Sequence, residues 1–162
     1  MNNDHIPIDS RMVANYLIFL ASQDGASLTP MQLLKLVYLC HGWFLAHFDR
    51  PLIQDRIEAW KYGPVIPGLY HTFKSFGSSP VVEIFRHPKQ KRPLSEEEKD
   101  LIGKVYDYYG SHSGTTLSAL THKKGSPWDD IWGGNSERGN TEIPDNIIKQ
   151  YYKGLLSSDN GY

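Results

Sequence analysis

Apolar residues recur with helical spacing in several stretches of the chain, and most of these stretches carry start and stop signals. Between Met12 and Leu20 they fall three and four residues apart, with Ser10 as a candidate N-cap and Gly25 as a stop. This pattern predicts an amphipathic helix. Its apolar stripe is wide enough to contact two neighbours, so we expect the helix to belong to the core.

The clearest helix start lies at Thr29, which can cap a helix that has Pro30 at its first position. Gln32 stands where a capping box needs its side-chain amide. Apolar residues then cover almost the whole circumference as far as His47, which predicts a central and buried helix. Lys35 is the one charged residue inside this segment. Because a buried ammonium group is costly, its side chain either extends to solvent or meets a carboxylate.

Shorter elements follow this central helix. Apolar and polar residues alternate over 57–62 and predict a strand that ends at Gly63-Pro64. Pro67 then begins a helix that Gly77 stops. Apolar residues in 81–85 predict a second strand, which we expect to pair with the first in a small antiparallel sheet.

The second half of the chain begins with another capping box. Ser95 and Glu98 precede a periodic apolar stripe that Gly110 closes, which predicts a helix. Either Thr115 or Thr116 caps a shorter helix after it. The other predicted segments are a basic surface loop at 87–93, a turn at 125–128, a loop at 133–140 and a final helix from Pro144 to Leu155.

Together these elements predict an α+β fold that is predominantly helical. We expect a single compact domain over residues 1–162, with about six helices and a small antiparallel β-sheet. The chain has 162 residues, which suits one domain, and 40% of them are hydrophobic against 22% charged, as in globular proteins. We find no internal repeat and no linker that would divide two cores.

Charge and cysteine content exclude several classes of protein. The net charge of -1 gives no excess of basic residues for holding a nucleic acid, so we expect the basic residues near 89–92 and at 123–124 to be solvated surface. Cys40 is the only cysteine, which excludes an internal disulfide bond. No apolar stretch approaches the ~20 residues needed to span a bilayer, and the polar start does not resemble a signal peptide. We therefore expect a cytoplasmic protein with no membrane partner.

No motif of the common catalytic templates occurs in the sequence. His41 and His47 are six residues apart and lie on different sides of a helix, whereas helical metal ligands are three or four residues apart. We therefore predict no catalytic residue, no metal ion and no cofactor, and a protein that is not an enzyme. A metal-dependent hydrolase or nuclease centred on His41 and His71 is kept as an alternative.

Two motifs carry a resemblance to a known family. The first is the sequence LTPMQLLKLVY at Leu28–Tyr38 with His41-Gly42-Trp43, and the second is IEAWKYGPV at Ile57–Val65 with Leu69-Tyr70. A weaker third match lies within 117–152. Over about residues 12–155 the chain resembles the Panacea-domain antitoxins, which include phage-associated proteins of the GepA and SocA type.

This resemblance implies an antitoxin that neutralises a cognate toxin by direct protein–protein binding, or alternatively an adaptor that delivers a bound protein to a protease. The aromatic content of 4 Trp, 10 Tyr and 6 Phe favours protein binding, because such side chains are enriched at binding hot spots. The motif around Gly63-Pro64 also has a purely structural interpretation, since it fixes a turn after the strand. The candidate partner-binding residues are Lys35, Tyr38, Trp60, Lys61, Tyr62 and Tyr70.

Overall fold

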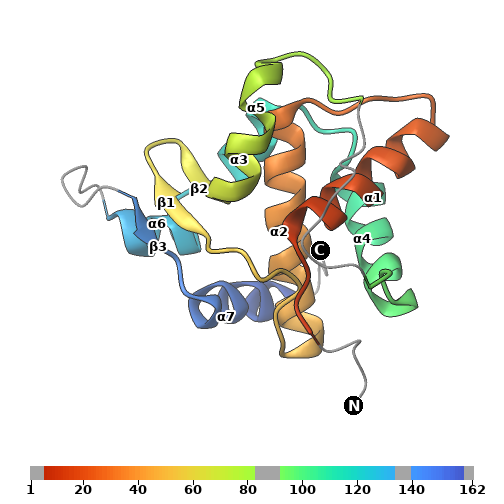
Figure 1. The fold of residues 1–162 in the computed structure, drawn as a ribbon. Helices are drawn as coiled ribbons and strands as arrows, with labels where there is room; N and C mark the ends of the chain where they lie inside the picture. The colour runs from red at the N-terminus through yellow and green to blue at the C-terminus, as the bar shows by residue number, and fades with distance from the viewer. Residues whose placement is uncertain (1–5, 83–91, 134–139, 159–162) are drawn as a thin grey trace.

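The long helix α2 (Pro30–Phe48) runs through the middle of the molecule in the computed structural model, which describes residues 6–82, 92–133 and 140–158 (Figure 1). The predicted capping box is present at its start. The Thr29 hydroxyl oxygen accepts a hydrogen bond from the Gln32 amide N–H, and the Gln32 side-chain oxygen accepts one from the Thr29 N–H. The helix is buried on nearly all sides, as its apolar pattern predicts.

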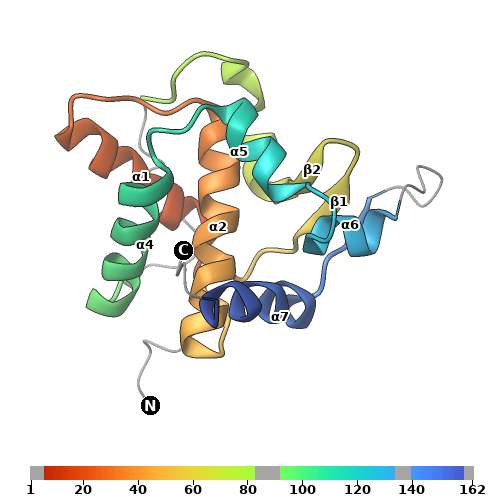
Figure 2. The same ribbon diagram turned by 180° about the vertical axis from the view of Figure 1, so that it is seen from behind.

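Four other helices surround α2. They are α1 (Ser10–Gln23), α4 (Glu96–Tyr109), α5 (Gly114–Thr121) and α7 (Asp145–Leu156). From behind, α7 crosses one end of α2, while α1 and α4 lie on one flank and α6 (Pro127–Trp132) lies with the strands on the other (Figure 2). This arrangement confirms the α+β fold class with a helical majority.

The small sheet has three antiparallel strands in the order β2-β1-β3. They are β1 (Glu58–Trp60), β2 (Gly63–Val65) and β3 (Thr141–Glu142). The strand predicted over 57–62 is present but ends at Trp60, and the expected pairing with 81–85 is wrong. The chain reverses directly after Trp60, so β2 and β3 occupy both edges of β1, and Val81 instead forms a single bridge with Leu28. Residues 83–85 lie outside the described part of the chain.

Helix starts account for the other differences from the sequence prediction. Asp9, not Ser10, caps α1, because the Asp9 carboxylate accepts the Arg11 N–H while Ser10 is the first helical residue. Similarly, Ser113 caps α5 in place of Thr115 or Thr116.

The predicted turn at 125–128 instead opens the short helix α6. Ser126 is its N-cap and Pro127 stands at its start, a combination that favours a helix. The described residues therefore form seven α-helices, where about six were expected. The helix predicted from Pro67 is present as α3 (Pro67–Phe73), which continues as the 3-10 segment η2 (Lys74–Phe76) and ends at Gly77. The basic loop at 87–93 and the loop at 133–140 lie mostly outside the described residues.

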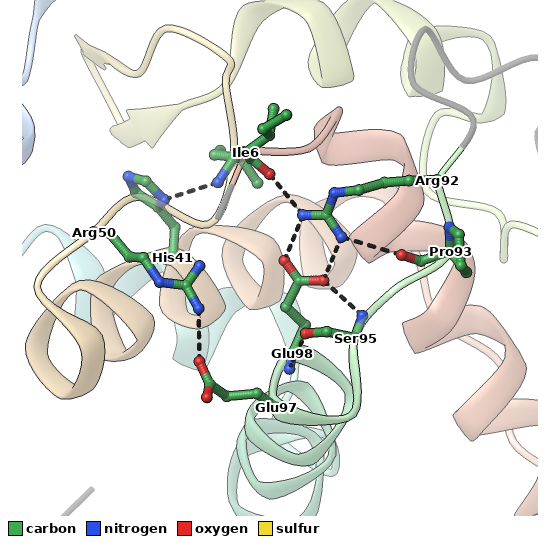
Figure 3. Close-up of polar contacts among 9 residues, drawn as sticks. Ile6, His41, Arg50, Arg92, Pro93, Ser95, Glu97 and Glu98 are labelled. Carbon is green, nitrogen blue, oxygen red and sulfur yellow. Dashed lines mark hydrogen bonds and ion pairs between the residues drawn. The ribbon is translucent and has the colours of Figure 1, made fainter. Parts of the chain in front are cut away.

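The start of α4 is held by a capping box and an ion pair (Figure 3). The Glu98 carboxylate, which is 1% exposed, accepts hydrogen bonds at 2.9 and 2.8 Å from the Arg92 guanidinium and one at 2.8 Å from the Ser95 N–H. Arg92 also donates to the Ile6 carbonyl, so the same side chain fastens the N-terminal segment to this helix. Burial by itself would raise the pKa of Glu98. The hydrogen bonds from Arg92 and Ser95 outweigh this effect, so that the pKa lies below its ordinary value.

Helix α7 lies very close to α2 because Gly42 has no side chain. A Cβ atom at Gly42 would stand 2.5 Å from the Tyr152 ring. His41 joins the same two helices, since its Nε2 lies 2.8 Å from an Asp145 carboxylate oxygen. The Ile53 N–H donates to His41 Nδ1 at 3.3 Å, which leaves Nε2 as the ring nitrogen that donates to Asp145.

Candidate functional site

An apolar pocket of about 500 Å³ lies between the first turns of α2, the β1–β2 hairpin and α3. This volume is in the range of protein sites that accept a ligand or an anchoring side chain. Its apolar walls come from the start of α2 and from the hairpin and α3, which directly follow one another in the sequence. They are formed by Pro30, Met31, Leu34, Trp60, Tyr62, Val65, Tyr70 and Phe73.

Local sequence places the walls of the pocket. Met31, Leu34 and Lys35 are three and four residues apart, so they share one face of α2. On α3, Tyr70 and Phe73 share a face for the same reason. Phe73 is fully buried and anchors α3 to the core, which leaves the half-buried Tyr70 to line the pocket above it.

The aromatic residues of the hairpin are fixed by several contacts. The Trp60 ring meets the Tyr70 ring edge to face, with 5.0 Å between centroids, and its indole N–H donates to Glu58 at 2.9 Å. The Trp60 carbonyl accepts a hydrogen bond from the Trp128 indole. Tyr62 is 71% exposed, and the Ser118 hydroxyl donates to its backbone carbonyl at 3.2 Å. The pocket therefore has a rigid aromatic wall and a solvent-facing aromatic rim.

Lys35 lies in the wall of the pocket with only 5% of its surface exposed. Its ammonium donates to the Pro64 carbonyl at 2.9 Å, and no carboxylate of the described residues lies within ion-pair distance. Both sequence expectations for this residue, extension to solvent or a carboxylate partner, are therefore wrong. The backbone of the hairpin provides the acceptor instead, and burial lowers the pKa of Lys35 to about 8.

Gly63 makes room for this ammonium. A Cβ atom at Gly63 would stand 2.9 Å from Lys35 Nζ, and its φ of +124° is one that side-chain-bearing residues rarely adopt. The expectation that Gly63-Pro64 makes the turn after β1 is wrong, because Lys61 and Tyr62 form that turn and both Gly63 and Pro64 pair with β1 as part of β2. The Gly63-Pro64 pair instead brings a carbonyl to the Lys35 side chain.

Two further lysines stand on the pocket, and both are exposed. Lys61 places its ammonium 5.3 Å from the Tyr62 ring centroid, and Lys74 follows α3. The other polar residues of the lining are Ser118 and Asn140. None of the described residues that line the pocket is acidic, so its charge is positive.

Five of the six candidate partner-binding residues come together in this pocket, namely Lys35, Trp60, Lys61, Tyr62 and Tyr70. Tyr38 does not. It is 1% exposed, its ring meets Tyr152 in the core, and burial raises its pKa. A partner that binds this folded arrangement does not reach Tyr38.

Several lining residues were missed by sequence reasoning. The sequence could have indicated Met31, Leu34 and Phe73, because each shares a helix face with a residue that was predicted to bind the partner. The sequence could not have indicated Ser118 and Asn140, since only the tertiary fold brings α5 and the segment before β3 to the pocket.

The histidine-centred alternative finds no support in the described residues. Protein groups occupy both ring nitrogens of His41, and His71 lies exposed on α3 against the Tyr70 ring. In the described ranges no three or more His, Cys, Asp or Glu side chains gather where they could hold a metal ion. Across the same ranges, no helix combines the length and the apolar character that crossing a bilayer requires.

Comparisons with known proteins agree with the resemblance of the two motifs. The family model for the SocA-like antitoxins with a Panacea domain matches residues 33–129, a range that contains most of the pocket. Antitoxin SocA of Caulobacter vibrioides is 32% identical to the chain over 164 aligned residues, which cover 94% of this chain and 87% of that protein. No solved structure matches the chain.

Proposed function

Because the chain belongs to the SocA-like antitoxin family with a Panacea domain, we propose that it neutralises a cognate toxin by direct protein–protein binding through the apolar pocket. The family relationship supports an antitoxin role and argues against catalysis. The observation that carries the proposed binding site is the pocket itself, which joins an apolar interior to an exposed aromatic rim. Anchors of this kind dominate the energy of protein interfaces.

Placement on rigid elements supports this site. The rim residue Tyr62 stands on a two-residue hairpin turn between paired strands, and the walls belong to α2 and α3. A surface that is already ordered loses little conformational entropy on binding. A bulky apolar side chain of the toxin can therefore enter without rearrangement of the backbone.

Co-expression with the product of the neighbouring gene tests the proposal. We expect that product to stop growth alone and to be harmless beside the wild-type chain. Tyr62→Ala should weaken the complex by roughly 10- to 30-fold, which corresponds to the ~2 kcal/mol cost of removing a hot-spot aromatic residue. Isothermal titration calorimetry with the purified proteins measures this change.

Phe19→Ala is the matched control, because Phe19 is also a large exposed side chain, at 47%, but lies on α1 outside the pocket. It should leave both growth rescue and affinity unchanged. If the neighbouring product still kills beside the wild-type chain, the antitoxin role is refuted. If Phe19→Ala and Tyr62→Ala behave alike, the pocket is not the binding site. The half-life of the toxin, measured with and without this chain, separates two modes of neutralisation. Occlusion leaves the half-life unchanged, whereas delivery to a protease shortens it.

A further inference from the structure

The Lys35 ammonium has more hydrogen-bonding capacity than the protein uses. An ammonium group carries three N–H donors, and Pro64 accepts one of them at 2.9 Å. The remaining two have no acceptor among the described residues. A positive group that lines an apolar pocket with unused donors strongly favours an anionic oxygen as its next partner.

The surroundings of Lys35 select the same kind of ligand. Lys61 and Lys74 stand at the same pocket, and none of the described lining residues carries a negative charge. Met31 and Tyr62, both exposed, extend the apolar lining to the surface. The pocket thus offers an apolar cavity beside positive charge, which is complementary to an apolar side chain beside a carboxylate.

From this charge complementarity we infer that the pocket binds an acidic segment of the partner protein, in which a large apolar side chain enters the cavity and an adjacent carboxylate pairs with Lys35. The inference rests on the proposed function and specifies the chemistry of the toxin segment. The apolar side chain meets the walls made by Leu34, Trp60 and Tyr70. Lys35 remains mostly protonated at neutral pH, since burial lowers its pKa only to about 8.

Two blocked peptides that differ in one charge test this inference. They are acetyl-Gly-Trp-Glu-Gly-amide and acetyl-Gly-Trp-Gln-Gly-amide, titrated into the ¹⁵N-labelled full chain at pH 7. We expect the Glu peptide to bind about tenfold more tightly, the gain that a charge-assisted hydrogen bond provides. The indole N–H resonance of Trp60 should shift with both peptides. Equal affinities, or shifts confined to residues outside the pocket, would overturn the inference.

Lys35→Met and Lys124→Met form a matched pair of variants. Methionine keeps the length of the lysine stem without its charge, and Lys124 is exposed outside the pocket. Lys35→Met should bind both peptides with the affinity of the Gln peptide, whereas Lys124→Met should keep the tenfold preference. Retention of that preference in Lys35→Met would contradict the inference. If a variant fails to fold, the comparison of the two peptides on the wild-type chain still tests the inference.

Growth rescue separates this inference from the antitoxin role. If the wild-type chain neutralises the toxin and Lys35→Met binds that toxin with unchanged affinity, the acidic-segment inference fails while the antitoxin role stands. If the wild-type chain does not neutralise the toxin, the antitoxin role fails first. A tenfold or greater loss of toxin affinity in Lys35→Met, with none in Lys124→Met, is the result expected from the structure.

Discussion

Lys35 carries a positive charge inside an apolar environment, and this has a measurable effect on stability. Burial lowers its pKa from the ordinary 10.5 to about 8. Below about pH 8 the ammonium is charged in both the folded and the unfolded chain, so the full cost of burying the charge opposes folding. Between about pH 8 and 10.5 the folded chain loses the proton first, and stability therefore rises with pH.

Lys35→Met removes this cost at every pH. We expect the variant to be more stable than the wild type at pH 7, and the difference in unfolding free energy to shrink by on the order of 1–3 kcal/mol between about pH 7.5 and 10.5. Urea unfolding of both proteins across this range measures the change. A difference that stays constant with pH would mean that Lys35 titrates as it does in the unfolded chain.

At the scale of single elements, the start of α4 depends on one carboxylate. Glu98→Gln retains an oxygen for the Ser95 N–H but removes the charge that pairs with Arg92, whose side chain is only 13% exposed. We expect a loss of roughly 2–4 kcal/mol in unfolding free energy, because a mostly buried guanidinium loses its counter-charge. Chemical denaturation at neutral pH measures this loss.

Glu97→Gln is the control for this prediction. Glu97 pairs with Arg50 at 2.6 Å but its side chain is 47% exposed, and such pairs contribute less than about 1 kcal/mol. The Glu98 contribution also has a defined pH dependence. Since its folded pKa is lowered, the contribution is complete above the ordinary value of 4.5 and is lost as pH falls through the folded pKa. Equal losses of unfolding free energy in Glu98→Gln and Glu97→Gln would refute the special contribution of the Glu98–Arg92 pair.

The elements show which parts of the fold were available from sequence. Capping boxes at Thr29 and Ser95 are local signals, so α2 and α4 were located correctly. Partners in the sheet are not local. An apolar run such as 81–85 shows that a strand is possible but not what it pairs with, and Val81 in fact bridges to Leu28. The short helix α6 was missed because its six residues are too few for helical periodicity to appear.

The pocket was predictable to the same extent. Residues of one motif, such as Trp60 and Tyr62, were recognised because they are neighbours in the sequence. The buried state of Lys35 was not, since it depends on the Pro64 carbonyl arriving from another element and on the missing side chain of Gly63. Tyr38 was included because it belongs to the same motif as Lys35, yet it faces α7 and the core.

At the scale of the whole molecule, the central position of α2 protects its thiol. Cys40 is fully buried in that helix, and burial raises its pKa. We expect an aromatic disulfide reagent to label the native chain at least about 1,000-fold more slowly than a free thiol, because access requires opening of the surrounding helices. The increase in absorbance of the released thiolate measures the rate.

A variant with an accessible thiol calibrates this experiment. Cys40→Ala combined with Ser75→Cys moves the single thiol to an exposed position on η2, where it should react at the rate of a small-molecule thiol. Binding of the partner, which stabilises the fold, should slow the labelling of Cys40 further and leave the labelling rate of the variant unchanged. Similar rates for the two thiols would show that α2 opens locally without unfolding of the rest.

The walls of the pocket come from the start of α2, the hairpin with α3, one residue of α5 and the segment before β3. Its surface is therefore a conformational epitope and not a linear one. No single peptide cut from the chain reproduces it, and proteolysis of any contributing stretch removes the whole surface at once. If the antitoxin binds its toxin here, the lifetime of the inactive complex is limited by how long the antitoxin stays folded and intact.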